Sequence, residues 1–458
     1  MLRHPASYRD PSGFIFKKDG LYLRQINPSY FEAYQAIKKA GIYEALWRKG
    51  WLIPHKEIKS SATEVILEPE QINFITYPYE WSFTAYKHAA QLTLRIQLFL
   101  LEKGFSLKDG SAFNITFKNG KAIFIDTLSI EPYREHEPWK ALQQFNENFF
   151  APLTLAKYYG SFYLKSLQHR INGFPLKEAS RLLPLSSKLN ATTYSHIHFL
   201  GKKENKETGT LVKDTKHKGL SKSAQIKMLK SLELHINDMS LKENTEWSTY
   251  YQQTNYEDAA FNLKKDRIAS WTQEVSAKKV VDLGGNNGTF GIESLKHAQQ
   301  VIVSDIDQSA IDHCYNQSIK NKEIRLIPVV TDLLQPAAGI GFNNEERSSF
   351  INRIKAYHPD LSMALALIHH ITLSGNVPFE MSAAFFSSLS KYLIIEFPDR
   401  EDSWVQFILD SKRDARHLFN DYNLAHFEKV YGDHFSILKR EKLPQTQRTL
   451  FLMKRYEG

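Results

Sequence analysis

Acidic side chains follow two apolar runs of the C-terminal half at a spacing that suits a nucleoside. The first run ends at Asp282 and passes directly into the turn DLGGNNG, residues 282–288. The second run, QVIVSD, ends at Asp305, 23 residues further along. Glycines let a backbone turn tightly, and a carboxylate after the second strand can accept hydrogen bonds from both hydroxyls of a ribose. We therefore expect a nucleoside site, with free N–H donors from the helix that opens at Gly288.

The glycine pattern, D-x-G-x-x-x-G, differs from the G-x-G-x-x-G of dinucleotide-binding folds. It resembles motif one of the class I S-adenosylmethionine-dependent methyltransferases, and the resemblance covers residues 240–458 approximately. It implies S-adenosyl-L-methionine (SAM) as cofactor, with Asp305 and Asp307 at the ribose-binding acid and Asp332 beside the adenine. The alternative is a Rossmann domain for another nucleotide, or one that has lost its ligand. The expected cofactor-binding residues are Asp282, Gly284, Asn286, Gly288, Asp305, Ile306, Asp332 and Leu333.

Three further side chains could do catalytic work on the acceptor of the methyl group. His369 and His370 follow the fourth predicted strand, and in an extended backbone they would face opposite ways, so that one lines the pocket. A histidine titrates near neutrality, which suits a general base for a hydroxyl acceptor. Glu396 ends the fifth strand and could hold a substrate hydroxyl or orient a histidine. The alternative is structural: backbone hydrogen bonds for the histidines and a solvated loop for the glutamate.

Residues outside these runs could bind the acceptor. Arg347 could hold an anionic group, or it could form a surface ion pair. Tyr250, like Trp247 and Tyr256, precedes the first strand and could cover the pocket, although ordinary packing explains these aromatic residues equally well. Residues 368–371 read IHHI, where methyltransferases of base amino groups carry an Asn/Asp-Pro-Pro-aromatic tetrapeptide. This difference argues against methylation of a DNA or RNA base, so we do not expect a nucleic-acid partner, although other nucleic-acid substrates stay open.

The elements that position these residues alternate between strand-like and helix-like patterns. Apolar strands separated by helices indicate a parallel sheet with helices on both faces. The last two strand-like runs, HFSILKRE and RTLFLMKRY, flank KLPQTQ and predict an antiparallel pair that finishes the sheet. The predicted fold class is α/β, with a Rossmann-like methyltransferase sheet and an antiparallel final strand in the C-terminal domain.

A second group of polar residues lies in the first 200 residues. Asp109 precedes Asn114 by five positions, and Asp126 follows a hairpin predicted around KNGK. This layout resembles the catalytic and metal-binding loops of protein-kinase-like folds, which implies Asp109 as the catalytic acid and Asn114 and Asp126 as ligands of Mg²⁺ with ATP. Leu107 replaces the usual histidine, and neither a glycine-rich loop nor a strand-three lysine is visible. We expect an α+β, degenerate kinase-like domain that assists substrate binding; an active kinase and an unrelated fold are the alternatives.

Bulk composition limits the remaining possibilities. With 458 residues the chain is long enough for two or three domains. The single cysteine excludes an intrachain disulfide, and the start carries no apolar signal region, so we expect a cytoplasmic protein without a membrane span. Residues 201–223 hold seven lysines and three acids and predict a basic flexible linker, or a nucleic-acid tether. The predicted domains are therefore 1–200 and 224–458.

The whole chain also resembles a bacterial methyltransferase family that includes NoeA-related nodulation proteins. The resemblance rests on stretches such as YRDPSGFIF, LKDGSAFNI and ALALIHH. It implies one two-domain protein that methylates a small molecule, saccharide or glycoconjugate. The alternatives are a bifunctional kinase–methyltransferase and a non-catalytic cofactor-binding protein.

Overall fold

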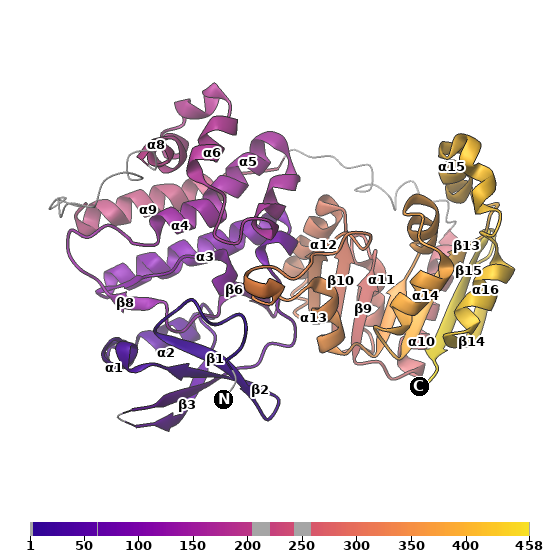
Figure 1. The fold of residues 1–458 in the computed structure, drawn as a ribbon, viewed down its shortest axis with the longest axis horizontal. Coiled ribbons are helices and arrows are strands. Elements are labelled where there is room, and N and C mark those ends of the chain that lie inside the picture. Colours follow the sequence, from indigo (N-terminus) through magenta and orange to yellow (C-terminus); the bar gives the residue numbers. More distant parts are fainter. Residues whose placement is uncertain (1–2, 62, 204–219, 242–257, 458) are drawn as a thin grey trace. The chain divides into compact units, whose positions relative to one another are not determined.

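The computed structural model describes residues 3–61, 63–203, 220–241 and 258–457. The chain divides into two units, the first comprising Met1–Glu243 with Ala338–Ser348 and the second comprising Asn244–Ala337 with Ser349–Gly458. Figure 1 colours both along the sequence. Among the described residues, no helix is long and apolar enough to cross a membrane.

The second unit is built on a seven-stranded sheet in the order β11-β10-β9-β12-β13-β15-β14 (Figure 1). Neighbours from β11 to β13 pair in parallel, and β15 runs antiparallel to both β13 and β14. The predicted α/β class and the reversed final pair are therefore confirmed. The strands are β9 (Lys279–Leu283), β10 (Gln300–Asp305), β11 (Leu326–Val330), β12 (Leu361–Ala364), β13 (Tyr392–Pro398), β14 (Phe435–Lys442) and β15 (Arg448–Arg455).

The sheet core is made of branched aliphatic side chains. Val280, Val301, Val303 and Ile394 are fully buried in one cluster that runs across neighbouring strands. Strands covered on both faces need such near-continuous apolar runs. The helices of this unit are α10 (Asp258–Glu274), α11 (Thr289–Ser294), α12 (Gln308–Lys320), α13 (Phe350–Tyr357), α14 (Phe379–Ser387), α15 (Ser403–Ser411) and α16 (Leu424–Gly432).

The first unit begins with a four-stranded antiparallel sheet in the order β1-β2-β4-β3. The hairpin expected around KNGK is confirmed, because Asn119-Gly120 joins β6 to β7. A second hairpin at Asp19-Gly20 joins β1 to β2, and all four turn residues have positive φ. The strands are β1 (Gly13–Lys18), β2 (Leu21–Ile26), β3 (His55–Ser60), β4 (Val65–Pro69), β5 (Phe105–Leu107), β6 (Ile115–Lys118), β7 (Lys121–Phe124) and β8 (Ile130–Pro132).

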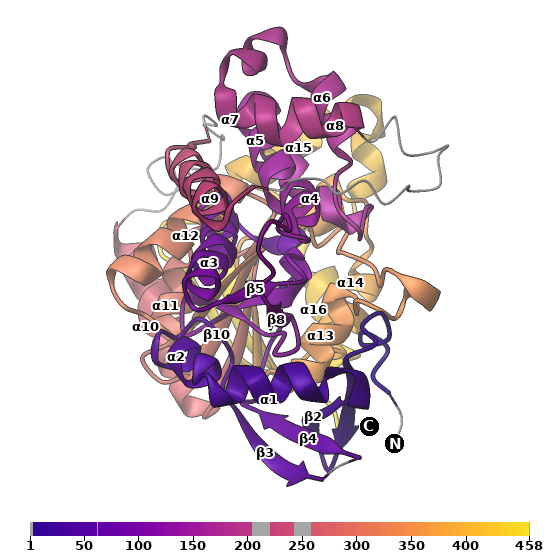
Figure 2. The same ribbon diagram turned by 90° about the vertical axis from the view of Figure 1, so that its left-hand side faces the viewer.

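Helices make up the rest of the first unit. The longest, α3 (Phe83–Glu102), is buried along most of its length. Figure 2 shows α6, α7 and α8 at the end of the unit that lies opposite β3. The other helices are α1 (Phe31–Lys39), α2 (Ile42–Arg48), α4 (Leu142–Phe145), α5 (Ala151–Tyr159), α6 (Leu176–Leu182), α7 (Ala191–Thr193), α8 (Leu200–Lys203) and α9 (Lys222–Asn237), with 3-10 turns η5 (Ser161–Gln168) and η6 (Leu185–Leu189) and the π-turn η7 (Tyr194–Phe199).

The division between the units differs from the predicted boundary at 201–223. Helix α9 belongs to the first unit, where Arg95 of α3 pairs with Glu233, and Lys87 donates to the backbone of Asn237 and Met239. Apolar periodicity predicts that a helix has a buried face, but it does not say which partner covers that face. Most of the predicted basic linker, 204–219, lies outside the described residues.

Candidate cofactor pocket and neighbouring polar clusters

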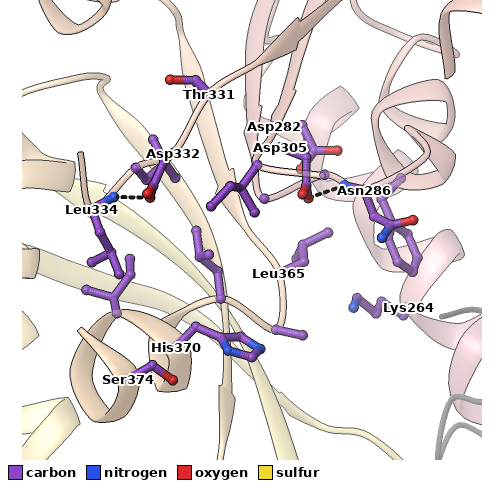
Figure 3. A pocket seen from close by; sticks show the side chains of 18 residues that line it. Lys264, Asp282, Asn286, Asp305, Thr331, Asp332, Leu334, Leu365, His370 and Ser374 are labelled. Carbon is purple, nitrogen blue, oxygen red and sulfur yellow. Dashed lines mark hydrogen bonds between the residues drawn. The ribbon is translucent and has the colours of Figure 1, made fainter. Parts of the chain in front are cut away.

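A cavity of about 260 Å³ lies at the carboxyl ends of the central parallel strands (Figure 3). Ligands of open α/β sheets bind at this edge, where neighbouring strands connect in opposite directions. Of the eight residues predicted to bind the cofactor, all except Gly288 line it. The lining residues are Lys264, Asp282, Gly284, Gly285, Asn286, Phe290, Asp305, Ile306, Thr331, Asp332, Leu333, Leu334, Leu365, Ala366, Leu367, His370, Ile371 and Ser374.

The turn after β9 is held close to the neighbouring strand by its glycines. The N–H groups of Gly284 and Gly285 both donate to the carbonyl of Ser304 on β10, at 2.8 and 3.0 Å. A Cβ on Gly285 would lie 2.6 Å from the Asp282 carboxylate, so a side chain there has no room. Gly288 has a φ of 80° and caps α11. The backbone of this turn therefore borders the cavity directly, so a ligand can approach it closely.

Asp305 is fixed at the end of β10 by two backbone donors. Its carboxylate accepts the N–H of Asn286 at 2.8 Å (Figure 3). It also accepts the N–H of Asp307 at 2.9 Å. Burial raises the pKa of Asp305, against the opposing effect of these two hydrogen bonds. Each oxygen of a carboxylate can accept more than one hydrogen bond. Asp305 is thus oriented by the protein and retains acceptor capacity toward the cavity.

Asp282 is a buried carboxylate without a hydrogen-bond partner among the described residues. Burial raises the pKa of Asp282 to about 7, and the nearby charge of Asp305 adds to the rise. Lys264 and the Gly291 backbone lower the pKa, but their effects are too small to compensate. A buried charge normally needs a partner. An ammonium group entering the cavity would supply one.

Lys264 reaches the cavity from α10 and is itself buried. Its Nζ donates to Glu396 at 2.5 Å and lies 4.2 Å from the centre of the Phe290 ring. Burial lowers the pKa of Lys264, whereas the contact with Glu396 raises it. Lys264 is one of the lining residues that sequence reasoning missed. Lys264 precedes the buried Ile268 by four residues, and Ile268 precedes the buried Trp271 by three. This helical spacing places a lysine on an apolar helix face and could have revealed Lys264 from the sequence.

Polar residues at the ends of β11 and β12 complete the wall. Asp332 lines the cavity and accepts the N–H of Leu334 at 2.8 Å. Thr331 and Ser374 add hydroxyl groups that were not predicted. Ala366 has a φ of 49°, which places it in the left-handed region directly at the cavity.

The backbone at the two histidines is not extended, so the condition under which they would face opposite ways is not met. Strand β12 ends at Ala364, and His369 has helical backbone angles. The two rings therefore lie with their centres only 4.2 Å apart. Short apolar runs such as LSMALALI do not distinguish a strand from a helical turn. His370 lines the cavity, whereas His369 is buried behind it, with Nδ1 unpartnered among the described residues.

Both imidazoles are neutral near physiological pH. Burial, with a smaller contribution from the charge of Arg448, lowers the pKa of His370 to about 4. Burial also holds the pKa of His369 well below its ordinary value, with contributions from His370 and Arg448. A neutral imidazole at the cavity wall can accept a proton or a hydrogen bond.

Glu396 does not line the cavity. It is fully buried and lies between two cations, Lys264 and Arg448. The guanidinium of Arg448 is 3.4 Å from the Glu396 carboxylate and also forms an ion pair with Asp402 at 2.7 Å. In this position Glu396 positions Lys264 instead of reaching into the cavity. The pairing joins residues 132 positions apart, which no local pattern reveals.

Of the residues predicted to bind the acceptor, Arg347 is not among those that line the cavity, and Tyr250 lies outside the described residues. Arg347 belongs to the first unit, where its guanidinium lies 4.7 Å from the centre of the Phe113 ring and donates to the carbonyl of Glu346 at 2.9 Å. Tyr250, Trp247 and Tyr256 lie outside the described residues.

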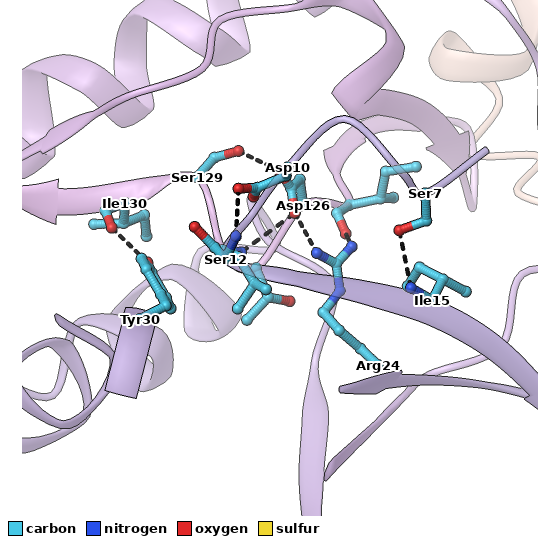
Figure 4. A network of polar contacts seen from close by, with 12 residues as sticks. Ser7, Asp10, Ser12, Ile15, Arg24, Tyr30, Asp126, Ser129 and Ile130 are labelled. Atoms are coloured by element: carbon cyan, nitrogen blue, oxygen red, sulfur yellow. Dashed lines mark hydrogen bonds and ion pairs between the residues drawn. The ribbon is translucent and has the colours of Figure 1, made fainter. Parts of the chain in front are cut away.

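In the first unit, Asp126 has a cationic partner where the kinase resemblance implies Mg²⁺ (Figure 4). It forms an ion pair with Arg24 of β2 and accepts the hydroxyl of Ser129. Burial would raise the pKa of Asp126, but Arg24 and these hydrogen bonds hold it below its ordinary value.

The other two kinase-like residues have no metal ligand set around them. Burial and the nearby Asp126 raise the pKa of Asp109, against a hydrogen bond from the Ser111 N–H and the effect of the Asn114 side chain. Among the described residues, no group of three or more His, Cys, Asp or Glu is placed to hold a metal ion. The Mg–ATP site stays a prediction without support.

No protein-family model matches the chain. The chain is 28% identical to nodulation protein NoeA of Rhizobium meliloti (strain 1021) over 99% of its length and 96% of that protein. Among solved structures, magnesium protoporphyrin IX methyltransferase (ChlM) from Synechocystis PCC 6803 with bound SAM is 15% identical and covers 46% of this chain and 90% of its own, with a TM-score of 0.32. N-methyltransferase NodS from Bradyrhizobium japonicum WM9 with S-adenosyl-L-homocysteine (SAH) is 10% identical, covers 46% and 100%, and has a TM-score of 0.31.

Proposed function

We propose that this chain, a class I SAM-dependent methyltransferase that resembles NoeA, transfers the methyl group of SAM to a small-molecule, saccharide or glycoconjugate acceptor. The observation that carries the proposal is the unpartnered, buried carboxylate of Asp282 beside a glycine turn and an oriented Asp305. These groups fit the ammonium and the ribose of one ligand.

The cavity residues match the parts of SAM one by one. Asp305 would accept hydrogen bonds from the ribose hydroxyls, since its carboxylate is already oriented by two backbone donors. Asp282 would pair with the ammonium of the amino-acid part and so gain the partner that it lacks. Ile306, Asp332 and Leu333 would surround the adenine, as the resemblance to class I methyltransferases implies.

The charges of the cavity favour a cation. Asp282 and Asp305 line it directly, and the one lysine in its wall, Lys264, is paired with Glu396. SAM carries a sulfonium, which makes the attached methyl group transferable without further activation. The protein then has to align the acceptor and, for a hydroxyl acceptor, to remove its proton.

His370 is the residue best placed to align an acceptor hydroxyl. It lines the cavity and is neutral at physiological pH, because burial lowers its pKa to about 4. A base with so low a pKa acts by accepting a hydrogen bond from the acceptor hydroxyl and holding it in line. His369 packs against His370 and positions it, and Glu396 does the same for Lys264.

Isotope transfer tests this proposal directly. Full-length protein is incubated with a cell extract and SAM that carries a labelled methyl group, and products are identified by untargeted mass spectrometry. A labelled small molecule or saccharide that is missing with Asp305→Ala is expected. A protein that binds SAH but labels nothing would support the non-catalytic alternative, and a labelled nucleic acid would contradict the acceptor class.

A further inference from the structure

Large apolar side chains are exposed together at the helical end of the first unit. Leu189 is 89% exposed, Leu185 is 77% exposed and Phe162 is 76% exposed. Single exposed apolar residues are normal, but contiguous ones mark a surface that contacts something else. These side chains lie on short turns and helices between α5 and α8, the end that Figure 2 shows opposite β3. We refer to residues 157–202 as the helical end.

Contacts and short spacing along the chain bring together the segments that carry these side chains. The Tyr159 hydroxyl donates to the carbonyl of Leu182 at 2.5 Å, which joins α5 to α6. Tyr163 connects Tyr159 to Phe162, with ring centres 5.9 and 6.0 Å apart. Leu182 is 45% exposed and precedes Leu185 and Leu189 by three and seven positions. The apolar side chains thus follow one another from η5 through α6 to η6.

The helical end is also strongly basic. It contains seven lysines and arginines against one acid, Glu178, and therefore carries a net charge of +6 out of +9 for the whole chain. Glu178 is itself paired with Arg170. Five of the bases have exposed side chains: Lys157, Arg170, Arg181, Lys188 and Lys202. Exposed leucine and aromatic residues surrounded by lysine and arginine are the composition of surfaces that bind anionic membranes.

We propose that the helical end binds the surface of an anionic lipid bilayer. Leu185, Leu189 and Phe162 would enter the boundary between headgroups and acyl chains, and the basic side chains would contact the phosphates. Tyrosines such as Tyr159, with an apolar ring and a polar hydroxyl, suit the same boundary.

Charge decides between this occupant and a second copy of the chain. A symmetric dimer through this face would bring two surfaces of charge +6 together, which repel each other. An anionic bilayer, in contrast, would neutralise the positive charge of the helical end and would also take up its apolar side chains. Binding should therefore need anionic lipid and should weaken with salt, because each basic residue near such a surface contributes about fivefold in affinity.

Co-sedimentation of the full-length protein with vesicles tests the proposal. Vesicles of phosphatidylcholine mixed with phosphatidylserine should bind the protein, and vesicles of phosphatidylcholine alone should not. The double substitution Leu185→Asp with Leu189→Asp should abolish binding without unfolding the protein, because both side chains are largely exposed. Arg181→Glu with Lys188→Glu should weaken binding by about 25-fold or more, since two bases at about fivefold each are removed.

Matched controls come from the second unit. Phe407 and Leu418 are 67% and 70% exposed, and replacing both with Asp should leave vesicle binding unchanged. Lys320→Glu with Lys355→Glu changes the net charge by the same amount at exposed positions and should have little effect. Failure of the wild-type protein to bind anionic vesicles, or equal losses in the control variants, would overturn the proposal. The assay involves no methyl transfer, so its outcome is independent of the proposed enzymatic function.

Discussion

Asp282→Asn should stabilise the apoprotein at alkaline pH and remove its affinity for the cofactor. In the folded protein burial raises the pKa of Asp282 from 3.8 to about 7, and the nearby Lys264 and the Gly291 backbone offset only part of this rise. Above pH 7 the buried group is ionised in both the folded and the unfolded chain. Burial of the ionised carboxylate then lowers the free energy of unfolding, and burial of a neutral amide of the same shape would not cause this loss.

The size of the effect follows from the pKa shift. A rise of about three units corresponds to about 4 kcal/mol, since each unit is worth about 1.4 kcal/mol. Because the folded pKa is raised, this destabilisation is absent well below pH 4, grows between pH 4 and 7 and is complete above pH 7. The asparagine side chain of the variant would still lack partners for its amide, which costs about 1–3 kcal/mol. At pH 8 the free energy of unfolding should therefore rise by about 1–3 kcal/mol.

Urea unfolding of full-length wild type and Asp282→Asn, at pH 5 and pH 8, measures this difference. The variant should gain stability at pH 8, and the gain should shrink at pH 5. Adding SAH should stabilise the wild type and leave the variant unchanged, because the ammonium loses its charged partner. A variant less stable than wild type at pH 8 would refute the reasoning, since it would mean that the carboxylate has a stabilising partner in the folded protein.

Three further substitutions test separate parts of the structure. His370→Ala should reduce turnover by about 10²-fold or more with little change in SAH affinity. His369→Ala should reduce turnover less, because it acts only through the position of the His370 ring. Equal activity of wild type and both variants would exclude a role of His370 in aligning the acceptor. Gly288→Ala should lower the melting temperature and weaken SAH binding, because Gly288 has a φ of 80° and a Cβ would lie 2.6 Å from Cys314 Sγ. An unchanged melting temperature would show that the turn accommodates the extra carbon. Asp126→Asn should cost about 1.5–3 kcal/mol in urea unfolding, because Arg24 loses a charged hydrogen-bond partner at a partly buried position. Wild type should release no phosphate from Mg–ATP, and phosphate release abolished by this substitution would establish a kinase.

The sequence was sufficient to predict the central sheet and to single out many of the residues that line the cavity. The strands are apolar runs whose ends carry the acids, and the turn at 282–288 has a residue pattern specific enough to identify its place. The two hairpins were predictable for the same reason, because Asp-Gly and Asn-Gly suit positive φ at both turn positions.

What the sequence did not reveal depends on contacts between distant residues. Glu396 meets Lys264 and Arg448 only after the sheet has formed. Residues 338–348 join the first unit through Glu346, which accepts hydrogen bonds from Tyr8 and Arg9, more than 330 positions earlier. The turn at His369 and His370 was missed because an apolar run before it was read as a longer strand.

Calorimetric titration of SAH into wild type and Asp305→Ala tests the central claim, that the cavity at the carboxyl ends of β9 to β12 is a SAM site. The wild type should bind one SAH per chain. Asp305→Ala removes an acceptor already oriented by the N–H groups of Asn286 and Asp307. One hydrogen bond to a charged group is worth about 1.5–3 kcal/mol, so the affinity should fall at least about tenfold. No binding by the wild type, or equal affinity in both proteins, would contradict the assignment.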